Sequence, residues 1–154
     1  MLNEGDAAPD VILQSPDGAE LKLASLKGRP LVLYFYPKDD TTGCTKEAQD
    51  FSGLAADFEK AGVGILGVSK DSPARHGKFI AKYDLRIPLA TDADGSVTEA
   101  FGTWIEKSLY GRKYMGIDRA TFLIDGTGKI VRIWRKVKVS GHVEEVLAAA
   151  KALA

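Results

Sequence analysis

Cys44 is the residue of this 154-residue chain best suited to covalent chemistry, and it is the only cysteine in the sequence. A single cysteine excludes an intrachain disulfide, a Cys-x-x-Cys redox pair and a zinc site built from several cysteines. In general usage a lone cysteine is more often an inert, buried hydrophobic residue than a nucleophile. Its position relative to the neighbouring elements therefore decides between the two interpretations.

Cys44 follows a polar loop, 38–43, which connects a predicted strand to a predicted helix. In the first helical turn, unpaired backbone N–H groups and the positive end of the helix dipole stabilise an anion. That placement favours the thiolate, which is the nucleophilic form of cysteine. Gly43 permits close approach to the backbone, and the hydroxyl of Thr41 is near enough to hydrogen-bond a small polar substrate. The alternative role for Thr41 is that of a helix-capping hydroxyl.

A cation would complete such a site, and Arg119 is the candidate. It stands at the start of a predicted strand, 120–124, which could pair beside the predicted central strand 31–36. The alternative is that Arg119 is an ordinary surface residue.

Other potential ligand sites are weaker. His76 and His142 are each predicted to be exposed on a polar helix, with no second histidine at ligand spacing. The glycines of 62–67 match the dinucleotide pattern Gly-x-Gly-x-x-Gly, but they fall inside a predicted strand that follows a helix, which reverses the required order. The segment 92–95 resembles the start of a calcium loop, yet Thr103 stands where the bidentate Glu is needed. We therefore predict no metal and no cofactor.

The elements that must position Cys44 follow from periodicity and turn residues. The segment 31–36 is apolar on both faces, as is typical of a buried central strand, and 42–60 has the apolar spacing of an amphipathic helix. The other predicted elements are an N-terminal hairpin (11–13 and 21–23), strand 63–68, a helix from Ser72 to Tyr83, strand 87–90, a short helix with a capping box at Ser96–Glu99, a hairpin (120–124 and 129–136) and a C-terminal helix capped by Ser140. Strands that alternate with helices predict one α/β domain, 1–154, with a mixed central sheet flanked by helices.

Composition excludes several classes of protein. With 45% hydrophobic and 27% charged residues the chain has an ordinary globular composition, and its 21 basic and 21 acidic residues cancel. There is thus no net field to attract nucleic acid or an anionic membrane, and no apolar run is long enough to span a bilayer. We expect a cytoplasmic protein without nucleic-acid or membrane partners.

The pattern Pro37-x-x-x-Thr41-x-x-Cys44 resembles the active-site motif of the peroxiredoxins. The longer stretches 35–48 and 110–125 are similar to the bacterioferritin comigratory protein, or peroxiredoxin Q, subfamily. This resemblance covers nearly the whole chain. It implies a thioredoxin-like fold with an N-terminal β-hairpin extension, in agreement with the element order above.

The resemblance also implies roles for single residues. Cys44 would attack a peroxide and become a sulfenic acid, and Arg119 would stabilise both the thiolate and the peroxide. Thr41 and the backbone N–H of Cys44 would hydrogen-bond the peroxide, Gly43 would line the same site, and Pro37 would shield it from water.

Two departures from the subfamily pattern stand out. Thr42 replaces a common proline, and Gln49 and Ile80 occupy the two usual positions of a resolving cysteine. The sulfenic acid must therefore be reduced by an outside thiol, survive as a signal, or proceed to sulfinic acid.

The sequence thus predicts a monomeric, one-cysteine peroxidase that reduces hydrogen peroxide or organic hydroperoxides with an external thiol such as thioredoxin, glutaredoxin or glutathione. The alternatives are a redox sensor or interaction module that signals through sulfenylated Cys44 without significant turnover, and an inert structural domain.

Overall fold

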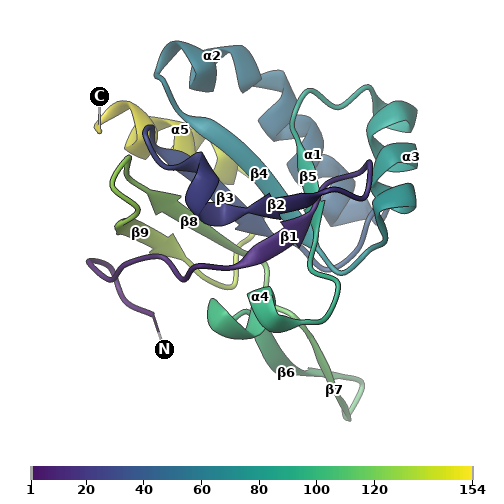
Figure 1. Cartoon of the computed structure of the whole chain (residues 1–154). Coiled ribbons are helices and arrows are strands. Elements are labelled where there is room, and N and C mark those ends of the chain that lie inside the picture. Colours follow the sequence, from purple (N-terminus) through teal and green to yellow (C-terminus); the bar gives the residue numbers. More distant parts are fainter. Residues whose placement is uncertain (1, 154) are drawn as a thin grey trace.

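A mixed seven-stranded sheet forms the centre of the protein, for which a computed structural model describes residues 2–153. The strand order is β2-β1-β5-β4-β3-β8-β9 (Figure 1). The strands are β1 (Ile12–Gln14), β2 (Glu20–Lys22), β3 (Leu31–Phe35), β4 (Gly64–Ser69), β5 (Leu89–Thr91), β8 (Ala120–Ile124) and β9 (Ile130–Trp134). β3, β4 and β5 are parallel, whereas β8 is antiparallel to both β3 and β9. The predicted mixed sheet with an N-terminal hairpin, β1–β2, is confirmed.

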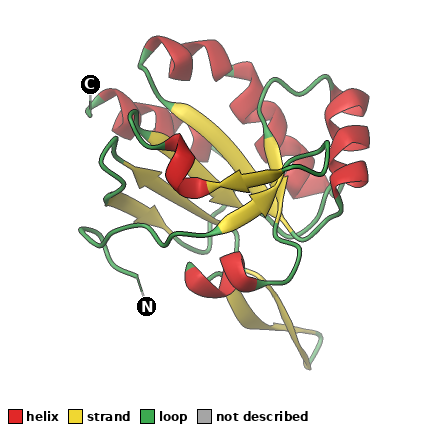
Figure 2. Cartoon of the chain, in the orientation of Figure 1, coloured by secondary structure: helices red, strands yellow, loops and turns green. Residues whose placement is uncertain are grey.

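Helices cover both faces of this sheet (Figure 2). Val32, Tyr34 and Tyr36 belong to one apolar cluster, whereas Leu33 and Phe35 belong to the other, because alternate strand residues face opposite sides. The first cluster is covered by α1 (Thr42–Gly53), α2 (Ala55–Lys60), α3 (Pro73–Tyr83) and α5 (His142–Lys151); η1 (Leu23–Leu26) and α4 (Ser96–Ala100) pack on the second. β3 is therefore buried on both faces, as its sequence predicted.

The predicted helix 42–60 is two helices, and the expectation of one continuous helix was wrong. α1 ends at Gly53, and Leu54 has φ −106° and ψ 8°, outside the helical region. Glycine is a weak helix former, so the chain turns there at low cost. The break lets Phe51 of α1 and Phe58 of α2 both pack in the core, with ring centroids 5.9 Å apart.

Two predicted helix caps were also wrong. α4 and α5 begin after Gly95 and Gly141, which have φ of 84° and 75°, rather than after a capping serine. At α4 the capping acceptor is the buried Asp92, whose carboxylate accepts the N–H groups of Val97 and Thr98 at 3.2 and 2.9 Å. A carboxylate serves because the first helical N–H groups have no partners within the helix. In contrast, the predicted cap of α3 is confirmed, since Ser72 Oγ accepts the N–H of Arg75.

A hairpin that sequence analysis did not predict separates α4 from β8. β6 (Trp104–Leu109) pairs with β7 (Arg112–Ile117) outside the main sheet and projects away from it (Figure 1). Tyr110 and Gly111 form the turn with positive φ, 51° and 78°. Two positive φ values are what a type I′ hairpin turn requires, so the Tyr-Gly pair was the available signal.

The glycines of the dinucleotide-like pattern have a packing role in β4. Gly67 is paired with Tyr34 of β3, and a Cβ at Gly67 would lie 2.7 Å from the Tyr34 ring. Glycine is thus required here because a neighbouring aromatic ring fills the space. Gly64 and Gly67 lie within β4, as predicted, whereas Gly62 lies in the turn before that strand with a φ of 75°.

Candidate active site

Cys44 lies in the first turn of α1, just beyond the loop that leaves the carboxyl end of β3. The helix begins at Thr42 after Thr41, so the N–H of Cys44 is among those that lack a helical acceptor. The cysteine is 2% exposed. The structure thus places the sulfur where the sequence predicted, at the positive end of a helix and shielded from bulk water.

Arg119 reaches the same place from a distant part of the chain. It immediately precedes β8, and the β3–β8 register pairs Phe35 with Ala120. This register brings Arg119 to the edge of the sheet where β3 ends and the loop to Cys44 begins. Arg119 Nη2 donates to Cys44 Sγ at 3.4 Å, so the guanidinium lies against the sulfur and is not an ordinary surface group.

Glu47 is a site residue that sequence analysis missed. Arg119 Nη1 donates to Glu47 Oε1 at 2.7 Å, while Glu47 is 0% exposed and its Oε2 has no partner among the described residues. Burial raises the pKa of Glu47 to about 7, with partial compensation from the charge of Arg119. The available signal was spacing, because Glu47 lies three residues after Cys44 and so on the same helix face.

The Arg119 guanidinium remains charged beside the sulfur. Burial alone would lower its pKa, but the charges of Glu47 and Cys44 outweigh that effect and raise the pKa above its usual value. The two arms of the guanidinium hold one partner each, which is a geometry that lysine cannot reproduce.

Gly43 leaves room for this guanidinium. A Cβ at Gly43 would lie 3.1 Å from Arg119 Nη2, closer than an ordinary contact. The close approach expected at Gly43 is therefore that of the arginine to the helix backbone.

Thr41 precedes α1 but does not cap it with its side chain. Its hydroxyl donates to the carbonyl of Lys38 at 2.8 Å. The lone pairs of Thr41 Oγ1 consequently remain available to accept a hydrogen bond. Pro37, two residues after the end of β3, is exposed.

The prediction that both histidines are exposed was wrong. His76 is 0% exposed and His142 is 5% exposed. His76 pairs with Asp39 at 2.7 Å, and His142 Nε2 lies 2.8 Å from Thr121 Oγ1. Buried polar groups require such partners, and those partners are remote in sequence, which is why local polarity misled the prediction.

A groove of about 420 Å³ runs beside the exposed face of the first turns of α1. Thr42, Thr45 and Gln49 line it from the helix, and Tyr83 of α3 lines its far side. Gln49, which occupies the position of a resolving cysteine, therefore lies in an open groove that is lined by residues on either side of Cys44 in the sequence but not by Cys44 itself.

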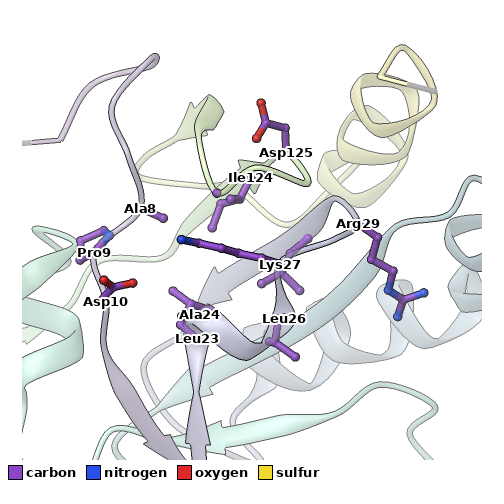
Figure 3. A pocket seen from close by; sticks show the side chains of 12 residues that line it. Ala8, Pro9, Asp10, Leu23, Ala24, Leu26, Lys27, Arg29, Ile124 and Asp125 are labelled. Carbon is purple, nitrogen blue, oxygen red and sulfur yellow. The ribbon is translucent and has the colours of Figure 1, made fainter.

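An apolar pocket lies at the opposite end of the sheet (Figure 3). Leu31 and Ile124 line it, and these residues are paired at the end of β3 remote from Phe35. Its volume of about 20 Å³ leaves room for roughly one water molecule. It is not part of the Cys44 site.

Residues 2–153 contain no cluster of three or more His, Cys, Asp or Glu side chains placed to hold a metal ion. Within the same residues, every helix is too short or too polar to cross a membrane.

Comparison with known proteins gives consistent matches over nearly the whole chain. The sequence pattern of the AhpC/TSA family matches residues 4–133. A putative peroxiredoxin Bcp of Coxiella burnetii is 50% identical over 146 residues, which cover 95% of this chain and 97% of the relative. A cysteine-to-serine mutant of PrxQ from Xylella fastidiosa superposes with a TM-score of 0.92 at 40% identity, covering 99% of this chain and 97% of that structure.

A second solved structure, described for its alkyl peroxide reduction activity, is the bacterioferritin comigratory protein of Xanthomonas campestris. It superposes with a TM-score of 0.88 at 44% identity, covering 96% of this chain and 98% of that structure. The mixed sheet and its helices are accordingly the thioredoxin-like fold of these proteins.

Proposed function

Because this chain belongs to the AhpC/TSA family and is a peroxiredoxin, a thiol-dependent peroxidase, we propose that Cys44, Arg119, Thr41, Gly43 and Pro37 form its peroxide site. The observation that carries this assignment is the 3.4 Å contact from Arg119 Nη2 to Cys44 Sγ at the start of α1. A guanidinium and a helix N-terminus both favour the thiolate over the thiol.

The first step oxidises Cys44 and reduces the peroxide. The thiolate attacks the terminal oxygen of ROOH, the S–O bond forms and the O–O bond breaks. The leaving oxygen takes the hydroxyl proton of the peroxide and departs as ROH, while the sulfenate takes a proton from solvent to give the sulfenic acid. Negative charge moves from sulfur to oxygen in this step, and donors placed along that path lower its barrier.

Arg119 and the N–H of Cys44 supply those donors. Thr41 has the complementary role, because its hydroxyl donates a hydrogen bond to the carbonyl oxygen of Lys38 and its oxygen can accept one from the O–H of the peroxide. Pro37 would shield the site from water, as the resemblance to the peroxiredoxin motif implies.

The second half of the cycle uses an external thiol. A thiol R′SH attacks the sulfenic acid to give a mixed disulfide and water, and a second R′SH releases Cys44 as R′SSR′ forms. The single cysteine of the sequence fits this one-cysteine type of cycle.

We propose thioredoxin, glutaredoxin or glutathione as the thiol donor, approaching through the groove lined by Thr42, Thr45 and Gln49. We further propose a monomer with a single domain spanning 1–154, because a chain of 154 residues is of the length that one hydrophobic core supports. A lone reactive cysteine also supports a reducing, cytoplasmic location.

The experiment that tests this function is steady-state consumption of hydrogen peroxide and of an organic hydroperoxide with each thiol donor in turn. We expect turnover that Cys44→Ser abolishes, because a serine hydroxyl stays protonated and is a poor nucleophile. Retained turnover in Cys44→Ser would exclude Cys44 as the nucleophile. If one equivalent of peroxide is consumed but no thiol supports turnover, the result would favour the redox-sensor alternative. The sulfur of Cys44, which is buried and accepts a hydrogen bond from Arg119, is equally suited to that role.

A further inference from the structure

A buried polar cluster ties the active-site loop to α3. Asp39 of the loop is 3% exposed, and its Oδ2 lies 2.7 Å from His76 Nδ1. His76 Nε2 lies 3.0 Å from the carbonyl oxygen of Ala90, and Tyr36 donates its hydroxyl to Asp39 Oδ1 at 2.5 Å. Among residues 2–153, none of these three side chains hydrogen-bonds to Cys44 or Arg119, so their burial needs an explanation other than direct contact with the sulfur or its cation.

The hydrogen-bond pattern defines the protons of the cluster. A carbonyl oxygen only accepts, so His76 Nε2 must carry a hydrogen. A further proton must lie between His76 Nδ1 and Asp39 Oδ2, because two lone pairs would otherwise face each other at 2.7 Å. Burial first, and then the charges of Tyr34 and Asp39, raise the pKa of Tyr36 far above its usual range, so Tyr36 stays a donor. Each of these hydrogen bonds thus has one donor and one acceptor.

The main chain of Asp39 is held as firmly as its side chain. Its N–H donates to Asp71 Oδ2 at 2.8 Å. Asp71 is itself fixed by the hydroxyl of Ser69 at 2.6 Å and by Arg75 at 3.2 Å.

This restraint reaches Thr41 through one peptide group. The carbonyl of Lys38 and the N–H of Asp39 belong to the same rigid plane. The N–H side is bound by Asp71, and the carbonyl side accepts the hydroxyl of Thr41 at 2.8 Å. Rotation of that plane would redirect the Thr41 hydroxyl.

We propose that His76 is a positioning residue for the peroxidase reaction. Through Asp39 it fixes the Lys38–Asp39 peptide plane and thereby directs the lone pairs of Thr41 at the bound peroxide. The inference rests on the proposed function but differs from thiolate stabilisation, because no hydrogen bond among residues 2–153 joins His76 to Cys44 or Arg119.

Two substitutions of His76 separate its two contacts. The amide nitrogen of Asn is attached to Cγ, as Nδ1 is, so His76→Asn retains a donor toward Asp39. The amide nitrogen of Gln reaches the position of Nε2, so His76→Gln retains the contact to Ala90 and loses that to Asp39. We expect His76→Gln to lower the second-order rate constant for peroxide about tenfold, since small misplacements of a contact group are costly, and His76→Asn to stay near wild type.

The discriminating measurement is alkylation of Cys44 by iodoacetamide, which needs the thiolate but not Thr41. We expect His76→Gln to leave the alkylation rate unchanged while the peroxide rate falls. Equal losses in both reactions, or equal losses in the Gln and Asn variants, would overturn the proposal. Ser72→Ala is the matched control, because it removes the cap of α3 and should lower the melting temperature without changing the peroxide rate.

A double-mutant cycle with Thr41→Val tests the route of the effect. If His76 acts through Thr41, His76→Gln should cause no further loss in the Thr41→Val background, whereas additive losses would overturn the proposal. If His76→Gln does not fold, Tyr36→Phe takes its place in the same cycle, because it removes the other side-chain donor to Asp39.

A wild-type protein that reacts with iodoacetamide but not with peroxide would contradict the proposed function itself. A wild-type protein that reacts with peroxide, together with an equal peroxide rate constant in His76→Gln, would contradict only the positioning role of His76.

Discussion

The Arg119 guanidinium lies against the backbone of Gly43, so closely that a Cβ there would be 3.1 Å from Nη2. The contact explains why a glycine directly precedes the reactive cysteine, since Gly43 does not have the positive φ that usually demands glycine. The position of the cation beside the sulfur therefore depends on the absence of a side chain at Gly43.

Gly43→Ala should displace the guanidinium by a few tenths of an ångström and reduce the rate of Cys44 oxidation by about tenfold. Stopped-flow tryptophan fluorescence with hydrogen peroxide measures that rate. The matched control is Gly77→Ala in α3, where a Cβ would meet nothing within 4 Å. Gly77→Ala should stabilise the protein by about 0.5–1 kcal/mol and leave the rate unchanged. A Gly43→Ala rate equal to that of this control would show that the contact is not functional.

Arg119→Ala should lower the peroxide rate by about 10²–10³, because it removes a donor from the path of the moving charge. It should also lower the thiolate fraction of Cys44 at neutral pH, measured by absorbance at 240 nm. Arg119→Lys should recover part of the thiolate but less of the rate, since an ammonium cannot hold Glu47 and Cys44 with two separate arms. Arg132→Ala, at an exposed surface pair with Glu145, is the control that should match wild type. Thiolate and rate values for Arg119→Ala that overlay those of Arg132→Ala would make Arg119 a surface residue in function.

Glu47 should make the protein less stable as pH rises. Its pKa is about 7 in the folded protein, against an ordinary value of 4.5 for a glutamate carboxyl, so the folded state binds more protons between these two pH values. The free energy of unfolding should therefore fall from about pH 4.5 to about pH 7, by roughly 3 kcal/mol at most from this group. Urea denaturation of Glu47→Gln and wild type at pH 5 and pH 8 isolates the effect, and the difference between the two pH values should be smaller in the variant. An identical pH dependence in both proteins would show that Glu47 does not titrate in this range.

Excess peroxide without a thiol should convert Cys44 to the sulfinic acid, because no second cysteine can trap the sulfenic acid. Intact-mass spectrometry should show a gain of two oxygen atoms, and an added donor thiol should suppress it. A mass that stays at the value of the untreated protein would contradict the expectation.

Gln49→Cys should allow an intramolecular disulfide to replace the sulfinic acid. Both positions lie within α1, where ideal geometry separates Cα atoms five residues apart by about 8.6 Å. A disulfide tolerates up to about 7 Å, so the first turn must unwind before the bond forms. Peroxide should then remove both free thiols without added oxygen mass and reduce helicity by circular dichroism. Sulfinic acid formed as readily as in wild type would indicate that this turn is too stable to open.

The sequence alone determined the local features of the site. Cys44 at a helix N-terminus, the buried strand before it and the hairpins β1–β2 and β8–β9 follow from periodicity and turn residues within short windows. The peroxiredoxin motif followed from the same short segment. These features were readable because they depend on residues close together in the chain.

Only the tertiary structure decided which distant groups meet Cys44. The register of β3 with β8 brings Arg119 to the sulfur of Cys44, which lies 75 positions earlier in the chain. Helix packing buries Glu47, which contacts the same guanidinium. His76 appeared exposed from its polar neighbours, yet α3 turns it toward Asp39, 37 positions away. Periodicity shows that a face is apolar, but the partner of a polar group on that face is fixed by the long-range pairing of strands and helices.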